Sequence, residues 1–111
     1  MSIGTGVRVL VTAAALGVCL SPGGPLRAGE GDTARVAERI HWLGHDAVRI
    51  DAGGTVIYID PWKLGAQPKK ADLVLITHDH GDHCSPADVK AVVQEGTEIV
   101  TVAAAAGKLE G

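Results

Sequence analysis

An apolar run followed at once by a cluster of histidines and acids constrains the fold of this 111-residue chain more than any other feature. Residues 71–77 are rich in β-formers and predict a buried strand. The next six residues, 78–83, have the form H-x-H-x-D-H and hold three of the chain's five histidines. Residues 85–88 then offer an N-cap serine, a proline at the first helical position and an acid at the third, which predicts a helix. The cluster should therefore occupy a strand-to-helix loop at the carboxyl end of a strand, where open α/β sheets keep their sites.

The cluster has the ligand types of a metal site. Imidazole and carboxylate groups are the usual ligands of zinc and related divalent ions. Residues two apart on an extended or looping backbone point the same way, so His78, His80 and Asp82 project together, while His83 approaches from the adjacent side. Asp79 should point away from them. The cluster has enough ligands for two neighbouring metal ions, and the alternative interpretation is a solvated histidine-rich loop.

The residues after the cluster predict a helix, a strand and the start of a second helix. Val89, Val92 and Val93 form an apolar stripe on the first helix, and Gly96 stands where a glycine would end it. Residues 97–102 have the composition of one more strand, and a helix should begin within 103–111. This order of elements is typical of an α/β fold with parallel strands.

Upstream of the cluster the chain predicts β structure. Residues 39–43 and 47–51 are short runs of β-formers, and the second run alternates apolar and polar residues. Two glycines at 53–54 predict a tight turn into a further strand at 55–60. Asp60 and the proline after it should end that strand, because proline cannot continue the hydrogen-bond ladder. These segments therefore form β-hairpins ahead of the strand that leads to the cluster.

The first 28 residues have the pattern of a bacterial-type export signal. Residues 9–20 are mostly small and apolar, with an arginine before them and a proline- and glycine-rich segment after them. Twelve residues are too few to span a bilayer, so no stable membrane span is expected. We expect residues 1–28 to be an export signal, 29–38 a linker and 39–111 the domain, in an exported protein of the periplasm or extracellular space. The alternatives are a disordered tail or a misplaced start codon, which would leave the protein in the cytoplasm.

Cysteine content and charge narrow the possible partners. Cys84 would be the one cysteine left after signal cleavage, so no internal disulfide is expected. We expect it to be a small buried residue, because the cluster supplies enough ligands without it. The alternative is a soft metal ligand or a reactive thiol near the metal. A net charge of -3, with two Trp, one Tyr and no Phe, offers neither a basic patch nor a stacking surface for bases. Nucleic acid is therefore not an expected partner.

Three blocks in this order resemble the amino-terminal half of the metallo-β-lactamase superfamily, most closely its ascorbate-6-phosphate lactonase-like branch of metal-dependent hydrolases. The blocks are Trp-Leu-Gly-His at 42–45, Ile-Tyr-Ile-Asp-Pro-Trp at 57–62, and the metal cluster with its flanks at 76–86. The likeness runs from about residue 40 to about residue 105. It implies an α/β fold that is the amino-terminal half of an αβ/βα sandwich, with β-hairpins followed by strand, loop, helix and strand.

The resemblance implies a role for each cluster residue. His78 and His80 would bind a first metal ion, and Asp82 and His83 would bind a second. A metal-bound hydroxide would attack an ester, a lactone or a phosphoester of a small molecule, with Asp82 as the candidate catalytic residue that holds the attacking water. Zinc is the default ion, and manganese or iron would also suit these ligands.

Two residues outside the cluster also match the family's pattern. Asp60 matches an acid that the family places after its hairpin and would orient a ligand histidine, although a turn former at a strand end is an equal alternative. His45 matches the family's glycine-histidine pair and could reach the mouth of the site. A lone histidine in a hairpin is more often structural, so both interpretations of His45 remain open.

Complete members of the superfamily continue through a second half that supplies the remaining metal ligands. No histidine follows His83 in this sequence. We expect the chain to be a fragment that lacks the downstream ligands and leaves one face of its sheet uncovered. Two alternatives are a half-domain that is active when it pairs with itself or with a separate carboxyl-terminal chain, and a non-catalytic metal-binding or interaction module. The sequence does not choose among the superfamily's small-molecule substrates.

Overall fold

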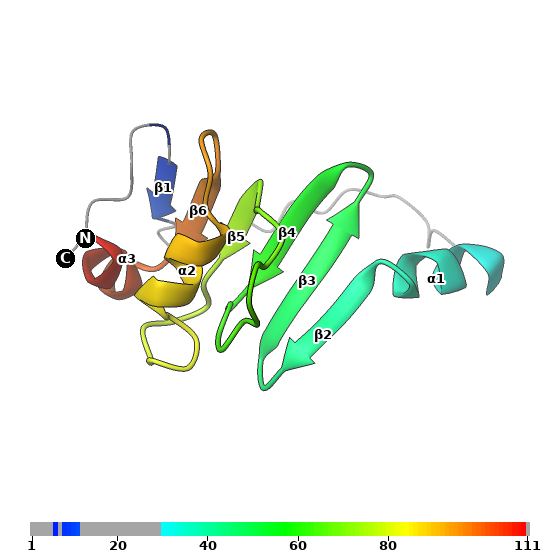
Figure 1. Cartoon of the computed structure of the whole chain (residues 1–111), viewed down its shortest axis with the longest axis horizontal. Helices are drawn as coiled ribbons and strands as arrows, with labels where there is room; N and C mark the ends of the chain where they lie inside the picture. The colour runs from blue at the N-terminus through cyan, green and yellow to red at the C-terminus, as the bar shows by residue number, and fades with distance from the viewer. Residues whose placement is uncertain (1–5, 7, 12–29, 111) are drawn as a thin grey trace, which may run out of the picture.

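One six-stranded sheet runs through the part of the chain that the computed structural model describes, residues 6, 8–11 and 30–110. Its strand order is β1-β6-β5-β4-β3-β2 (Figure 1). The elements, in chain order, are β1 Arg8–Val11, α1 Glu30–Ala37, β2 Ile40–Gly44, β3 Ala47–Ala52, β4 Thr55–Ile59, β5 Leu73–Leu75, α2 Pro86–Val92, β6 Glu98–Thr101 and α3 Ala103–Leu109. The order of hairpins, then strand, loop, helix and strand, confirms the α/β fold predicted from the sequence.

The sheet is antiparallel on one side and parallel on the other. Strands β2, β3 and β4 pair antiparallel, whereas β4, β5, β6 and β1 run parallel. Gly53 and Gly54 join β3 to β4 with φ values of 59° and 97°, which glycine adopts without strain. The parallel pairs require crossovers, and α2 provides the one between β5 and β6. The hairpins and the crossover both form where the sequence predicts them.

Helix α2 begins as predicted and ends earlier than predicted. The Ser85 side chain accepts a hydrogen bond from the Asp88 backbone N–H, and Pro86 is the first helical residue. The helix ends at Val92, because Val93 has an extended backbone with φ −65° and ψ 148°. Gly96, which we expected to end the helix, instead lies in the turn before β6 with φ 85°. The last residue of the predicted apolar stripe is therefore the helix cap.

The core lies on the face of the sheet that carries α2 and α3. Tyr58, Val74 and Ile99 are cross-strand neighbours on β4, β5 and β6, and all three are buried. Both helices lie on one face of the sheet (Figure 1), and Val89 and Val92 of α2 and Leu109 of α3 belong to the same buried cluster. Burial of these side chains is the main favourable term for this face. Cys84 is also in the core, as expected, and burial raises the pKa of its thiol.

The opposite face of the sheet is apolar and is covered by no helix of the described part of the chain. Two cross-strand rows cross this face, and their apolar members are half-buried or exposed: Ile40, Ile50, Ile57 and Leu73 in one row, and Trp42, Val48, Ile59, Leu75, Val100 and Leu10 in the other. Trp42 is 75% exposed. The described residues therefore leave this face of the sheet open.

The amino-terminal segments contribute one edge strand and one helix. β1 lies within the predicted export signal and pairs parallel with β6. Most of the rest of that segment, residues 1–5, 7 and 12–28, lies outside the described residues, and export stays a prediction. The predicted linker is largely helical, since α1 occupies 30–37 (Figure 1). Its side chains at 31–37 are exposed. Within the described ranges, no helix combines the length and the apolarity that crossing a bilayer requires.

A charged network on the helix-bearing face ties β3 to the loop after β4. The Asp51 carboxylate lies 3.0 Å from Lys69 Nζ and 3.1 Å from Arg49 Nε. His41 Nε2 on β2 lies 3.2 Å from the same carboxylate. The hydrogen bond from Lys69, followed by that from Arg49, lowers the pKa of Asp51 against the opposing effect of burial. The charged carboxylate therefore stabilises the folded state.

We predict that Asp51→Asn lowers the free energy of unfolding at pH 7 by about 1 kcal/mol, a value discounted for partial exposure of the network. Because the pKa of Asp51 is lowered on folding, its contribution is present above the ordinary aspartate pKa and is lost as the pH falls through the lowered one. Urea unfolding followed by tryptophan fluorescence should show the difference at pH 7 and its disappearance in acid. Asp32→Asn on exposed α1 is the control, and equal stability of wild type and Asp51→Asn at pH 7 would contradict the prediction.

Candidate metal centre

Three segments far apart in the sequence meet at one edge of the sheet. Because β4 and β5 are parallel, the chain leaves both at the same edge, after Ile59 and Leu75, which are paired. Because β3 is antiparallel to β4, Val48 near the start of β3 pairs with Ile59. The turn between β2 and β3 therefore lies at the edge where Asp60 ends β4 and where the loop after β5 begins. The strand-end position predicted for the cluster at 78–83 is confirmed.

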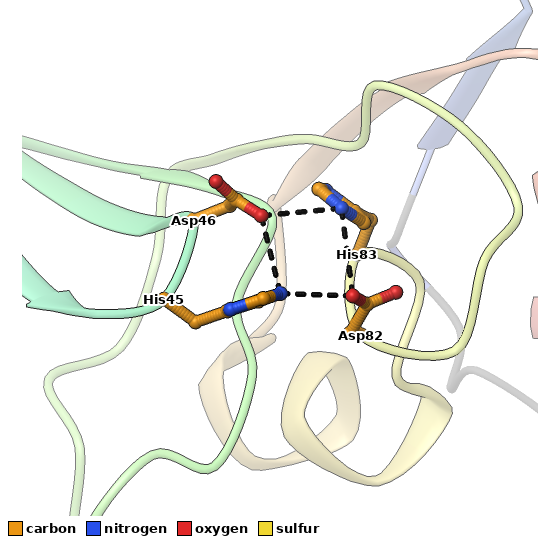
Figure 2. Close-up of side chains that lie close together, drawn as sticks. All are labelled: His45, Asp46, Asp82 and His83. Carbon is orange, nitrogen blue, oxygen red and sulfur yellow. Dashed lines mark hydrogen bonds and ion pairs between the residues drawn. The ribbon is translucent and has the colours of Figure 1, made fainter.

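Four side chains form what we call the turn cluster: His45 and Asp46 from the β2–β3 turn, and Asp82 and His83 from the loop after β5 (Figure 2). One ligand atom of each lies within 4.8 Å of all the others. His45 Nε2 is 2.8 Å from Asp82 Oδ2 and 3.2 Å from Asp46 Oδ2. His83 Nε2 is 3.2 Å from Asp46 Oδ2 and 3.8 Å from Asp82 Oδ2. Two imidazoles and two carboxylates thus alternate around one point.

Asp60 fixes the orientation of His83. Its carboxylate is buried, and Oδ2 lies 2.7 Å from His83 Nδ1. The backbone N–H of Thr77 donates to Asp60 Oδ1 at 2.8 Å, and the Thr77 hydroxyl donates to Oδ2 at 2.6 Å. With Nδ1 engaged by Asp60, His83 presents Nε2 to the turn cluster. A carboxylate that orients a histidine through its other nitrogen is the usual partner of a metal-binding histidine.

His78 and His80 lie next to the turn cluster and outside it. His78 Nε2 is 3.2 Å from His80 Nδ1, and the Thr77 hydroxyl lies 2.9 Å from His78 Nδ1. The rings of His78 and His83 have centroids 3.9 Å apart. A second compact group of donors joins Asp60, His78 and His83, and His80 belongs to neither group formed by the described residues. The structure brings together the predicted pairs, His78 with His80 and Asp82 with His83, and their assignment as ligands stays a prediction.

The charges of the site shift two pKa values in opposite directions. The hydrogen bond from His45 is the first cause that lowers the pKa of Asp82. The hydrogen bond to Asp60 is the first cause that raises the pKa of His83, and the charges of Asp60, Asp82 and Asp46 add to it against partial burial. Asp82 is therefore charged at neutral pH, and a metal ion competes with a proton for His83 Nε2. These neutral-imidazole and carboxylate donors fit a divalent ion such as zinc.

Backbone and side-chain contacts hold the β2–β3 turn against the loop. Gly44 has φ 108° and His45 has φ 52°, which lets the chain reverse within two residues after a register shift in β2. The Trp42 indole N–H donates to the His45 carbonyl oxygen at 2.7 Å. The rings of His45 and Trp62 have centroids 4.9 Å apart. The placement of His45 is thus determined by two tryptophans from different segments.

The structure adds one residue that the sequence analysis did not identify, Asp46. Little in the sequence indicated that Asp46 belongs to the site, because an acid in a hairpin turn is usually a turn former. Strand pairing supplies the missing information, since it places this turn beside Asp60 and Asp82. Asp79 was expected to point away from the metal ligands, and its carboxylate lies 3.2 Å from Lys108 Nζ on α3. The hydrogen bond from Lys108 to the Asp79 carboxylate lowers the pKa of Asp79.

Comparison with known proteins supports the family suggested by the three blocks. Residues 39–110 match the family described as "Beta-lactamase superfamily domain". The chain belongs to the metallo-β-lactamase superfamily. It carries an amino-terminal portion of that fold, and the match covers both β-hairpins, the metal cluster and the two helices of the core. The ascorbate-6-phosphate lactonase-like branch stays a prediction.

This superfamily member is similar to several proteins named as metal-dependent hydrolases. It is 38% identical over 104 residues to a UPF0173 metal-dependent hydrolase of Cupriavidus necator, covering 77% of this chain and 35% of that protein. It is 40% identical over 87 residues to one of Cupriavidus taiwanensis, covering 63% of this chain and 30% of that protein. The crystal structure of a proposed metal-dependent hydrolase from Parabacteroides distasonis aligns with a TM-score of 0.60 and 33% identity, over 65% of this chain and 34% of that one. The metallo-β-lactamase-superfamily chain described here thus spans about a third of the length of these relatives.

We predict that Asp60→Asn lowers the pKa of His83 from its raised value, because the replacement removes both the charge and the strongest hydrogen-bond acceptor on Nδ1. Imidazole NMR signals followed against pH, in protein kept metal-free with a chelator, would measure the change. Asp79→Asn is the matched control and should leave the His83 titration unchanged, since Asp79 pairs with Lys108. If the His83 titration is the same in Asp60→Asn as in wild type, Asp60 does not hold that proton.

Proposed function

We propose that this chain provides the metal-binding portion of a hydrolase that uses a divalent metal ion to cleave an ester, a lactone or a phosphoester of a small molecule. One observation carries the proposal: imidazole and carboxylate donors from separate segments converge at one sheet edge, and a buried carboxylate orients the central histidine. The names of the relatives support the same reaction class.

Each residue of the site has a task in this proposal. His78 and His80 would hold one ion through nitrogens 3.2 Å apart, and Asp82 and His83 would hold a second. When bound, such an ion lowers the pKa of coordinated water from ~16 toward ~7 and polarises the oxygen under attack. Zinc is the default, and manganese or iron would also suit the ligands. Asp60 is a positioning residue, since it acts through His83.

Asp82 is the candidate for orienting the attacking water. Its lowered pKa keeps the carboxylate charged at neutral pH, so it accepts hydrogen bonds and does not donate them. It is half-buried at the mouth of the turn cluster, where a water molecule and a substrate can both reach it. A charged acceptor at a fixed position directs a lone pair of the water toward the carbon or phosphorus under attack.

In this proposal, hydrolysis also requires a second portion of the fold, which the longer relatives contain. The chain covers 35% of the Cupriavidus necator protein, so about two thirds of that relative has no counterpart here. A chimera tests the combination. Residues 39–110 replace the aligned segment of the Cupriavidus necator protein, and the substrates are lactones and phosphodiesters that the unmodified Cupriavidus protein hydrolyses.

We predict that the chimera hydrolyses these substrates, that a chelator stops the reaction and that added zinc or manganese restores it. His80→Gln should lower kcat/KM by about 100-fold or more, because weaker metal binding removes the main source of rate acceleration. His41→Gln is the matched control, since His41 lies beside Asp51 and away from the site. A folded, metal-loaded chimera without activity would contradict the proposal and indicate a non-catalytic metal-binding module.

A further inference from the structure

We propose that the β2–β3 turn supplies two metal ligands, His45 and Asp46, so that the turn cluster binds one divalent metal ion with residues of this chain alone. The inference rests on the proposed function, because Asp82 and His83 belong to the same centre. Four protein ligands fill a tetrahedral ion, so the hydroxide of the proposed reaction would belong to the ion that His78 and His80 hold, which keeps open positions. It replaces the structural interpretation of His45 with a ligand role and gives a role to Asp46, which no sequence pattern identified. The site would have two nitrogen and two oxygen ligands.

The spacing of the four donor atoms suits a tetrahedral ion. Zinc binds nitrogen and carboxylate oxygen at about 2.0–2.2 Å, which places neighbouring ligands of a tetrahedron about 3.3–3.6 Å apart. The four contacts around the turn cluster are 2.8, 3.2, 3.2 and 3.8 Å. These values bracket the tetrahedral edge.

The two imidazoles present the same nitrogen to the centre for different structural reasons. His83 uses Nε2 because Nδ1 is held by the buried Asp60 carboxylate. His45 uses Nε2 because its backbone, with φ 52°, and the Trp62 ring direct the imidazole toward Asp82. Ligands that are oriented before binding lose less conformational entropy when the ion enters. The histidines of the turn cluster are therefore oriented for metal binding before an ion enters.

The charges balance for a divalent ion. Asp46 and Asp82 together carry two negative charges, and neutral imidazoles add none, so the loaded centre has no net charge. Without an ion, the same carboxylates are compatible with two protonated histidines, which is an ion-pair network. Both a metal centre and an ion-pair network explain the distances. In a metal centre, removing the Asp46 carboxylate weakens metal binding; in an ion-pair network, it does not. The experiment must separate these two states.

The inference also predicts the stoichiometry. His80 belongs to neither compact donor group of the described residues, so His78 and His80 offer two ligands to the first ion. Two ligands bind an ion more weakly than four. The chain by itself should therefore bind one ion tightly at the turn cluster.

Isothermal titration of the chelator-stripped, full-length chain with Zn²⁺ tests this, with far-UV circular dichroism to verify that each variant folds. We expect one tight site per chain, and we expect Asp46→Asn and His45→Gln each to weaken the affinity by at least about tenfold, the least that perturbing a ligand shell costs. Asp46→Glu keeps the carboxylate and should retain more affinity than Asp46→Asn. The matched controls Asp79→Asn and His41→Gln should bind zinc as wild type does, because their side chains pair with Lys108 and Asp51.

Equal zinc affinity in wild type, Asp46→Asn and His45→Gln would overturn the inference and leave an ion-pair network only, and so would a wild-type chain that binds no zinc. A measurement that needs no variant is the visible spectrum of the Co²⁺-loaded wild type. Intense d–d absorption supports a four-coordinate centre, and the weak bands of six-coordinate cobalt contradict it. If the chain binds one zinc ion tightly and both turn variants weaken it, but the chimera hydrolyses nothing, only the proposed function is contradicted. Hydrolysis by the chimera with unaltered zinc binding in both turn variants would remove this inference alone.

Discussion

The buried carboxylate of Asp60 is the interaction on which the arrangement of the site depends. It ends β4, accepts two hydrogen bonds from Thr77 after β5, and lies 2.7 Å from His83 Nδ1. One residue thereby connects the end of β4, the start of the loop after β5 and His83. A buried carboxylate is costly unless its oxygens have partners, and here Thr77 and His83 provide them. The position of His83 is therefore part of the folded structure before any ion binds.

Sheet connectivity explains why the other donors reach the same place. A parallel pair brings the ends of β4 and β5 to one edge, and an antiparallel hairpin returns the β2–β3 turn to that edge. A parallel β3 would have carried this turn to the opposite edge, out of reach of Asp82. The mixed sheet is thus what brings donors from both the hairpin and the loop after β5 into the turn cluster.

The sequence predicted local structure better than it predicted contacts between segments. The Ser85 cap, the diglycine hairpin and the strand before His78 follow from short-range chemistry, and all are present. Gly96 was a wrong helix end, because the extended backbone of Val93 ends α2 earlier and no residue type in the sequence announces it. Asp46 was missed because its importance depends on pairing between β3 and β4, a contact that composition and spacing do not encode.

The strands that position the centre are also those with the least cover. The helices α2 and α3 pack on β4, β5 and β6, whereas Ile40 and Trp42 of β2 are exposed. The β2–β3 hairpin is held by its ladder, by the Asp51 network and by the contacts of His45.

Any ion that bridges the β2–β3 turn to the loop after β5 would bind the folded hairpin and not the unfolded one. Binding would then stabilise the hairpin by mass action. If the turn binds an ion as proposed, metal affinity and hairpin stability are linked. A substitution on the open face of β2 or β3 that loosens the hairpin would then weaken metal binding at the turn, even though it touches no ligand.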